Sequence, residues 1–423
     1  MRACAALLFA GILAAQPVPQ WQELRRAARV AREAKDYAAW RDNLRKLYAI
    51  APGHPGMVYN QGAAEALLGN QNAALEWLSL YADMGFAWDI AKDEDLASIR
   101  RSDGFKPILD RMAENRKPFS QSKVAFTLPE KDLLAEDIAY DPKTKTFYVS
   151  SIHHRKILAI DSHGAARDFI SEGQDGVWGI LALAVDAKRR VLWASTAAMP
   201  QALGYQASDK GRSAMLKYDL RTGHLLKRYD LRPEADSQHV LGDMTLSPAG
   251  DVYVGDATGA VYTIQAERDV LEILVAPGEL IGPQTPALTP DGKRLFVADY
   301  GRGIAIIDLA SRAVSWLALP KNLGVAGSDG LYLAGRQLIA VQNGTSPMRI
   351  IRIQLDSTLT RAESWKLIEA NTPALGTPTH AVVVGKALYF IGNSGWDNFS
   401  DEGPINPGAT FTPPQILQAP LAP

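Results

Sequence analysis

The stretch PQTPALTPDGKRLFVADYG, residues 283–301, contains two short apolar runs joined by a Pro-Asp-Gly turn. Each run is too short for a typical globular helix and is bounded by turn-forming residues, which is the pattern of two antiparallel strands. The second run, RLFVAD, ends in a small residue followed by a polar one. The same ending occurs in five other runs of the chain: TFYVSS, VLWAST, DVYVGD, QLIAVQ and LYFIGN.

These six runs mark a repeat whose markers are 43 to 60 residues apart. Their final residues are Ser151, Thr196, Asp256, Asp299, Gln342 and Asn393. Units of this length with four strands are typical of β-propeller blades. In the sixth unit, PQILQAPL near the C-terminus supplies the third strand, and Lys123–Leu128 supplies the fourth from the other end of the domain. The pattern predicts a mainly β protein with a six-bladed propeller over residues 118–423.

Residues 20–117 lack strand-like alternation and carry apolar residues at helical spacing, in helix-turn-helix units of about 34 residues. The stretch GNQNAALEWLSLYADMGF resembles the second half of a tetratricopeptide repeat, and DEDLASIRRSDGFKPILDRM resembles the helical segment that closes short arrays of such repeats. We therefore expect a small all-α helical-repeat domain before the propeller. It either packs as a cap on the propeller or offers a docking surface to a protein partner.

The first 19 residues, MRACAALLFAGILAAQPVP, combine an early Arg with a short apolar run and a Pro-containing end, which is the layout of a secretory signal peptide. We expect a secreted or periplasmic protein without a membrane span after cleavage. Cys4, the only cysteine, lies within this segment, so the mature chain would have no disulfide or thiolate. Lys and Arg number 45 against 46 Asp and Glu, and this balance argues against a nucleic-acid partner.

Antiparallel order assigns the loops to two faces of the predicted propeller. Both long insertions, Ala197–Arg212 and Ser394–Pro413, fall on one face, which we take as the functional face. On that face the innermost strands begin near the ring axis, so their first residues converge: Glu136, Trp178, Gly179, Gly242, Asp243, Gln284, Asp329 and His380. Such a set suits a hard divalent cation, most readily Ca²⁺. Alternatively, these polar groups hydrate a water-filled channel.

The chain also resembles the senescence marker protein/gluconolactonase family of six-bladed propellers. The Glu that opens the first blade carries this resemblance, together with LGDMTLSPAGDVYVGD, SDGLYLAGRQLIAVQNG and residues 283–301. In that family a Glu, two Asn and an Asp bind the catalytic metal, and the Asp also moves a proton. The resemblance places Glu136 and Asp329 in the Glu and Asp roles. Gln284 stands at one Asn position, whereas Gly242 replaces the other, beside Asp243.

The resemblance implies metal-assisted hydrolysis of a sugar lactone or related small ester, with Asp329 as general base and Glu136, Gln284, Asp329 and Asp243 as metal ligands. The alternative is a non-catalytic propeller that binds a small ligand or a protein. The residues expected to contact substrate near the mouth are Trp178, His380, Asn393 and Trp396.

His153 and His154 also lie in a connection on the functional face. Neighbouring side chains on an extended segment point in opposite directions, so the sequence predicts that these two do not share a metal. His239 is expected to be exposed in a loop.

Overall fold

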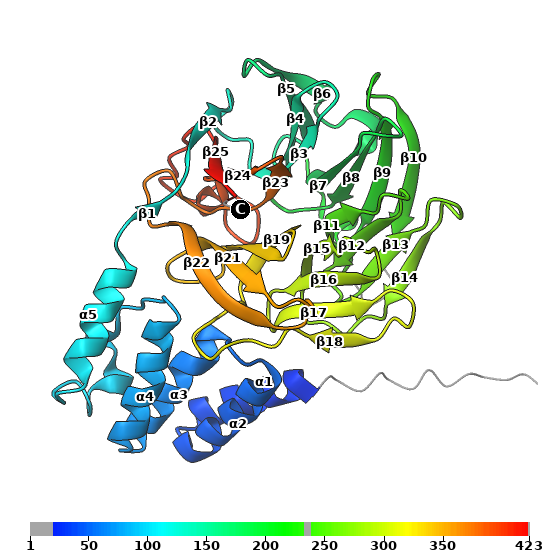
Figure 1. Ribbon diagram of the computed structural model, residues 1–423. Coiled ribbons are helices and arrows are strands. Elements are labelled where there is room, and N and C mark those ends of the chain that lie inside the picture. The colour runs from blue at the N-terminus through cyan, green and yellow to red at the C-terminus, as the bar shows by residue number, and fades with distance from the viewer. Residues whose placement is uncertain (1–19, 232–237, 422–423) are drawn as a thin grey trace, which may run out of the picture.

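The computed structural model describes residues 20–231 and 238–421, and the predicted signal peptide lies outside this part of the chain. Six antiparallel sheets are arranged around one axis, with a cluster of helices beside the ring (Figure 1). The predicted fold, a six-bladed propeller preceded by helices, is confirmed. Each of the six marker runs forms the second strand of its sheet.

The first three blades each contain four strands in sequence order. They comprise β3 (Ala135–Asp141), β4 (Thr146–Ser151), β5 (Lys156–Ile160) and β6 (Ala166–Ile170); β7 (Gly179–Asp186), β8 (Val191–Ala197), β9 (Ser213–Asp219) and β10 (Leu225–Leu231); and β11 (Leu241–Leu246), β12 (Val252–Asp256), β13 (Val261–Ile264) and β14 (Leu271–Val275). The first strand of each blade is the innermost one and lines the axis.

The fourth and fifth blades repeat this order, and the fifth gains an extra edge strand. They comprise β15 (Pro283–Leu288), β16 (Arg294–Asp299), β17 (Gly303–Asp308) and β18 (Val314–Trp316); and β19 (Ser328–Ala334), β20 (Gln337–Gln342), β21 (Arg349–Leu355), β22 (Ala362–Ala370) and the added β1 (Phe119–Ser120). Because β1 pairs with the outer edge of β22, the linker after the helices becomes part of the fifth sheet.

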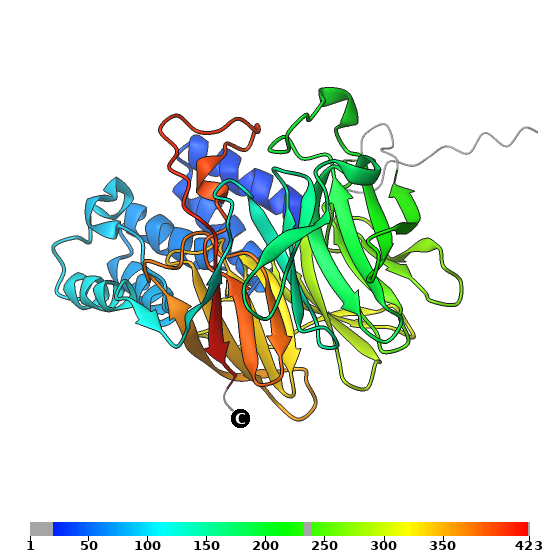
Figure 2. The same cartoon turned by 90° about the horizontal axis from the view of Figure 1, so that it is seen from above.

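The sixth blade joins the two ends of the domain. Its strands are β23 (Ala381–Val384), β24 (Ala387–Ile391), β25 (Gln415–Pro420) and β2 (Lys123–Thr127). β2 is antiparallel to β25, with Lys123 opposite Gln418 and Thr127 opposite Gln415, so the predicted closure is confirmed. The long loops after β8 and β24 extend beyond the sheets on the same side, opposite the C-terminus (Figure 2).

The helical module has a core of its own. Its elements are α1 (Gln20–Glu33), α2 (Tyr37–Ile50), α3 (Pro55–Leu67), α4 (Gln71–Asp83), two short 3-10 turns (Ile90–Lys92 and Glu94–Leu96) and α5 (Phe105–Asn115). Asp36 caps α2 by accepting a hydrogen bond from the Ala39 amide at 3.0 Å. Trp40, Leu78 and Phe105 are buried in one apolar cluster, so these helices pack as a unit.

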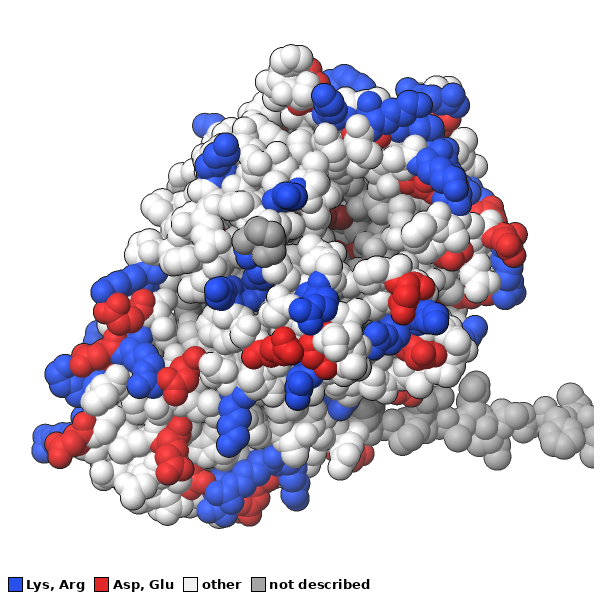
Figure 3. All heavy atoms as spheres, in the orientation of Figure 1, with Lys and Arg blue, Asp and Glu red and all other residues white. Residues whose placement is uncertain are grey.

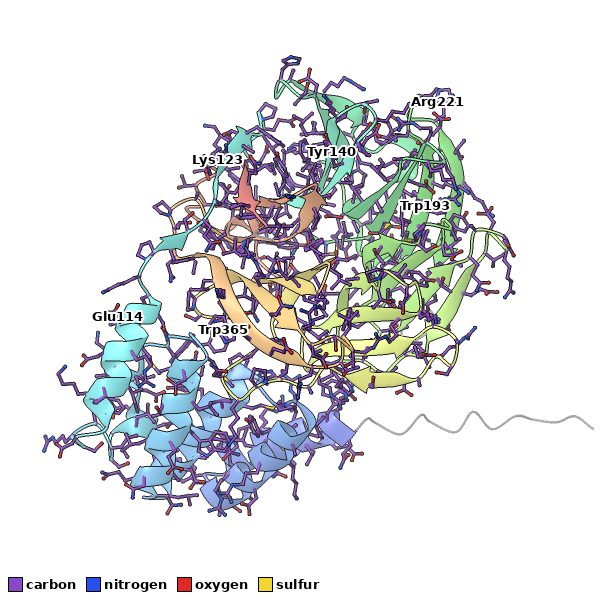
Figure 4. The ribbon with its side chains drawn as sticks, in the orientation of Figure 1. Glu114, Lys123, Tyr140, Trp193, Arg221 and Trp365 are labelled. Carbon is purple, nitrogen blue, oxygen red and sulfur yellow. The ribbon has the colours of Figure 1, made fainter. Side chains whose placement is uncertain are left out.

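Arg349 on β21 connects this module to the propeller. Its side chain is fully buried between the rings of Phe86 and Trp365, 4.1 and 4.9 Å from their centroids. Its Nη1 donates to the Met84 carbonyl oxygen at 2.7 Å, and its Nε donates to Oε1 of Gln342 at 2.7 Å. Trp365 lies between the fifth blade and the helices (Figure 4). Burial lowers the pKa of Arg349 to about 9, which still leaves it charged at neutral pH.

Replacing Arg349 with Ala should destabilise the fold by about 3 kcal/mol or more, because it opens a cavity and leaves the Met84 carbonyl and the Gln342 amide oxygen without their donor. Urea unfolding measures this loss. Arg336→Ala is the matched control, since Arg336 is exposed on the same blade and should change the free energy of unfolding by less than about 0.5 kcal/mol. Equal stability of the two variants would contradict the proposed role of Arg349.

Candidate functional site

The axial residues are set by an irregularity that recurs at the start of the innermost strands. In five blades the register between the first and second strands shifts near the axis, as between Ala135 and Ile138 in β3. Such bulges release residues from regular pairing and re-aim their side chains. The released positions include Glu136, Asp137, Asp243, Thr285 and Asp329, which provide most of the polar groups near the axis.

Glu136 and Asp329 occupy equivalent positions of β3 and β19, and both are buried. Oε2 of Glu136 accepts a hydrogen bond from the Trp396 indole at 2.7 Å. Oδ2 of Asp329 accepts one from the Asn343 amide at 2.6 Å, and the Asn343 Oδ1 in turn accepts from the Tyr300 hydroxyl at 3.1 Å. Both carboxylates are therefore held in fixed orientations by donors from surrounding loops and strands.

His380 links these groups to a second carboxylate layer. Its Nε2 lies 2.6 Å from Oδ2 of Asp243 and 3.9 Å from Oδ1 of Asp329. Its Nδ1 lies 2.8 Å from the Glu136 carbonyl oxygen, which can only accept, so Nδ1 carries a proton. The Asp243 Oδ2 also accepts from the Thr285 hydroxyl at 2.7 Å. The imidazole thus touches or approaches three acidic residues from three different blades.

The charge at the axis shifts the pKa values of these groups. Burial raises the pKa of Glu136 to about 8, that of Asp137 to about 7 and that of Asp329 to about 6. Burial would lower the pKa of His380, but the carboxylates of Asp243 and Asp329 raise it well above its usual value. The axial group therefore has an excess of acid that a single positive imidazole partly neutralises.

These residues fit a divalent cation. One possible ligand atom each from Glu136, Asp329 and His380 lies within 4.8 Å of the others. The protonated Nδ1 of His380 donates to a backbone carbonyl, as is usual for a metal-binding histidine, and leaves Nε2 as the possible ligand. The metal would replace the proton on Nε2. Ca²⁺ prefers oxygen ligands alone, whereas an imidazole nitrogen suits Mn²⁺ or Zn²⁺.

A channel of about 470 Å³ runs along the axis below this group. The end of the channel next to the axial group is lined by Asp137, Asp243, Thr285 and His380. The other end includes Pro248 and Pro290, which lie in the short turns between the first and second strands of the third and fourth blades. Figure 3 shows this central hollow, with acidic atoms in its depth. The sequence predicts a functional face on the side of the long loops, but this cavity approaches the axial group from the opposite face, where the first and second strands of each blade are joined by short turns.

The structure brings together Glu136, Asp243, Asp329, His380 and Trp396 from the predicted site. It places three other predicted residues in different surroundings. Trp178 lies under Arg228, 4.8 Å from ring centroid to guanidinium carbon, in a pocket beside the second blade. Asn393 holds the start of β25, accepting from the Gln415 amide at 2.7 Å. Gln284 is half-buried on β15, next to Thr285.

Sequence reasoning missed Asp137, Thr285 and Asn343. Asp137 follows Glu136 directly and accepts hydrogen bonds from the Ile138 and Leu183 amides, both at 2.7 Å, so it ties the first blade to the second. In a regular strand Asp137 would point away from the face occupied by Glu136, and only the bulge allows both to turn inward. The Glu-Asp, Gly-Asp and Gln-Thr pairs at equivalent positions of three blades were the available signal.

Two structural expectations for histidines were wrong, namely the extended segment at His153 and His154 and the exposure of His239. Residues 152–155 form a turn rather than an extended segment, so one ligand atom each from His153 and His154 lies within 4.8 Å of the other and of an Asp132 oxygen. His239 is buried rather than exposed, and its Nδ1 lies 2.9 Å from Oδ2 of Asp256.

Solved structures with a similar fold include a gluconolactonase from Xanthomonas campestris, with 16% identity over 72% of this chain and 89% of that chain and a TM-score of 0.46. Another is a calcium-binding protein, regucalcin, from Agrobacterium tumefaciens, with 14% identity over 70% and 93% and a TM-score of 0.45. A third is virginiamycin B lyase from Staphylococcus aureus, with 16% identity over 65% and 82% and a TM-score of 0.44. The first two represent the family that the sequence resembles. No protein-family model matches the chain, and no curated protein sequence is significantly similar to it.

Within residues 20–231 and 238–421, none of the helices is both long enough and apolar enough to cross a bilayer.

Replacing His380 with Gln should destabilise the metal-free protein more at pH 8 than at pH 5. Without the imidazolium, the pKa values of Glu136, Asp137 and Asp329 rise further, and a buried acid whose folded pKa exceeds its unfolded pKa opposes folding increasingly as the pH rises between the two values. We expect a loss of about 3–5 kcal/mol at pH 8, as for a broken buried ion pair. Chemical unfolding with a chelator present measures it.

His163→Gln is the matched control, because the His163 side chain is 88% exposed on the first blade. It should leave the stability at both pH values unchanged. A loss for His380→Gln that is the same at pH 5 and pH 8 would contradict the role of His380 as the counter-charge.

Proposed function

We propose that this protein hydrolyses a lactone or a related small ester at the propeller axis with the help of a divalent cation. The observation that carries this proposal is the convergence of Glu136, Asp329 and His380, with ligand atoms within 4.8 Å of one another among buried acids. Such a group favours a divalent charge, because one imidazolium cannot balance four carboxyl groups. A cation held there would polarise the ester carbonyl and lower the pKa of an attacking water.

Asp329 is the general base in this proposal. In the metal-free protein, burial raises the pKa of Asp329 to about 6; a bound cation would lower this pKa, so that the carboxylate is ionised at neutral pH and can accept a proton. The Asn343 amide holds its Oδ2, so the other carboxylate oxygen remains on the side of His380. Trp396 fixes the orientation of Glu136 in the same way. These donors keep both carboxylates in place before substrate arrives.

The channel supports a substrate with an apolar part. Away from its acidic end, the channel is lined by apolar side chains that include Leu183, Met244, Leu331 and Val382, and also by Thr245 and Thr289. The apolar side chains would pack against a hydrocarbon group, whereas they offer no hydrogen bonds to the hydroxyl groups of a sugar. Among the substrate classes expected from the sequence, we therefore favour a small ester or lactone that carries a hydrocarbon group.

Replacing Asp329 with Asn tests the proposal. The variant should lose at least about 100-fold in divalent-metal affinity and in turnover of a panel of lactones and aryl esters, because the amide is a weaker ligand and no base. Calorimetric titration with Ca²⁺ and Mn²⁺ and hydrolysis assays measure both effects. Asp291→Asn, in the tight turn after β15, is the matched control and should change neither. Wild-type metal affinity and turnover in Asp329→Asn would refute the site.

A second candidate is ligand binding in the channel without turnover. It is favoured by the Asp243–His380 pair, because the positive imidazole of His380 already offsets the Asp243 carboxylate and so takes the place of a cation. Gly242 separates the two candidates, because the resemblance places a metal-binding Asn at this position. A Cβ on Gly242 would meet no heavy atom within 4 Å, and Gly242 is not among the glycines with positive φ. The position therefore accepts a side chain without backbone strain.

Gly242→Asn should tighten divalent-metal binding by about tenfold, since it adds one neutral oxygen ligand while leaving Glu136 and Asp329 intact. If hydrolysis is the function, turnover should rise with it. Metal titration and the ester panel are compared with those of Gly242→Ala, which fills the same space without a ligand atom. Tighter metal binding without any turnover would support the binding role, and no change in either would contradict the axial metal site.

A further inference from the structure

A second cluster of metal-ligating side chains lies in the turn between β4 and β5, away from the axial group. Asp132 precedes β3, and His153 and His154 occupy the turn itself. One possible ligand atom from each of the three lies within 4.8 Å of the others, and the imidazole centroids are 5.1 Å apart in an edge-to-face arrangement. None of these residues belongs to the axial site.

Both imidazoles are oriented by an acceptor at Nδ1. The Nδ1 of His153 lies 2.6 Å from the Gln201 carbonyl oxygen, and the Nδ1 of His154 lies 3.2 Å from Oε2 of Glu172. A carbonyl or carboxylate oxygen accepts and does not donate, so each Nδ1 carries the proton. In a neutral imidazole this leaves the lone pair on Nε2. Metal-binding histidines are typically supported in this way, by a carbonyl or carboxylate on the other nitrogen.

The Nε2 of His154 provides an independent observation. It is buried and lies 3.1 Å from Oδ1 of Asp132, which is an ion-pair distance, but the two groups are not aligned as in a regular hydrogen bond. A buried polar atom without a hydrogen bond is costly and needs an explanation. The Nε2 of His154 and the Oδ1 of Asp132 are close but not aligned for a hydrogen bond, so they are positioned as ligands of a shared cation.

We propose that Asp132, His153 and His154 bind a divalent transition metal, best suited to Zn²⁺. Two imidazole nitrogens and one carboxylate oxygen match the ligands that Zn²⁺ takes from proteins, and a three-ligand set leaves one position open to water or another ligand. Glu172 is a positioning residue that holds His154. This site shares no residue with the axial site, so this proposal can fail while the proposed hydrolytic function stands, and the reverse.

A metal at this turn would affect the two long loops of the propeller, because both contact His153. His153 accepts a hydrogen bond from the Leu203 amide at 2.9 Å through its carbonyl oxygen, and its ring packs against Phe399 at 5.0 Å. Leu203 belongs to the long loop after β8, and Phe399 belongs to the long loop after β24. Metal binding at the turn would therefore fix the point at which both long loops meet the first blade.

The test measures Zn²⁺ binding to the full chain by calorimetry, in a Glu136→Gln/Asp329→Asn background that lacks both axial carboxylates. We expect this protein to bind one equivalent. His154→Gln and Asp132→Asn should each weaken this binding by at least 100-fold, and Glu172→Gln by about 10–100-fold. X-ray absorption of the Zn²⁺-bound protein should show two imidazole ligands.

His163→Gln is the control, because it removes an exposed imidazole from the same blade and should leave Zn²⁺ binding unchanged. Asp132 and His154 are chosen for substitution because His153 is tied to both loops, and circular dichroism verifies that each variant is folded. Absence of Zn²⁺ binding in the background protein would overturn the proposal and would mean that His154 is an imidazolium held between Asp132 and Glu172. Undiminished binding in folded His154→Gln would overturn it as well. Neither result decides whether the axial site exists, which is tested by Asp329→Asn and Gly242→Asn.

Discussion

The antiparallel pairing of β2 with β25 joins the two ends of the propeller and fixes six innermost strands around one axis. Closure gives the sixth blade its fourth, outermost strand, so every blade has at least four strands. It also forces the beginnings of those strands toward one point, whatever residues they carry. Because Glu136, Asp243 and Asp329 stand at these beginnings, closing the ring brings acids together from three blades. The fold therefore places several acidic side chains close together, and their repulsion must be offset by positive charge.

His380 supplies positive charge beside these acidic side chains. It enters from the sixth blade, the one assembled by closure, and its two nitrogens reach the Glu136 carbonyl and the Asp243 carboxylate. A positive imidazole here lowers the cost of ionising the surrounding acids. The same two contacts also orient the ring so that a cation could replace the proton on Nε2. The same orientation of His380 therefore serves both to offset the negative charge and to bind a cation. For this reason the site suits either a catalyst or a binding module.

The sequence predicted the blade count, the closure by Lys123–Leu128 and the axial positions of Glu136, Asp329 and His380, because a repeated strand pattern carries that information. It did not predict the bulges, since a bulge depends on the pairing between strands rather than on the residues of one strand. Asp137 was missed for this reason. The role of Arg349 was missed as well, because its partners Met84 and Phe86 come from the helical module and are brought near it only by tertiary packing.

The loop after β24 connects the two candidate metal sites. Trp396 donates to Glu136 at the axis, and Phe399, three residues later, packs against His153 in the turn between β4 and β5. The short 3-10 turn Trp396–Asn398 lies between them, and the apolar cluster under it includes Leu134 and Ile152 of the first blade. Because this turn packs on the apolar cluster, it holds Trp396 and Phe399 at fixed positions relative to Glu136 and His153. Ordering of this loop by a metal at the histidine turn would therefore also stabilise the indole that orients the Glu136 carboxylate.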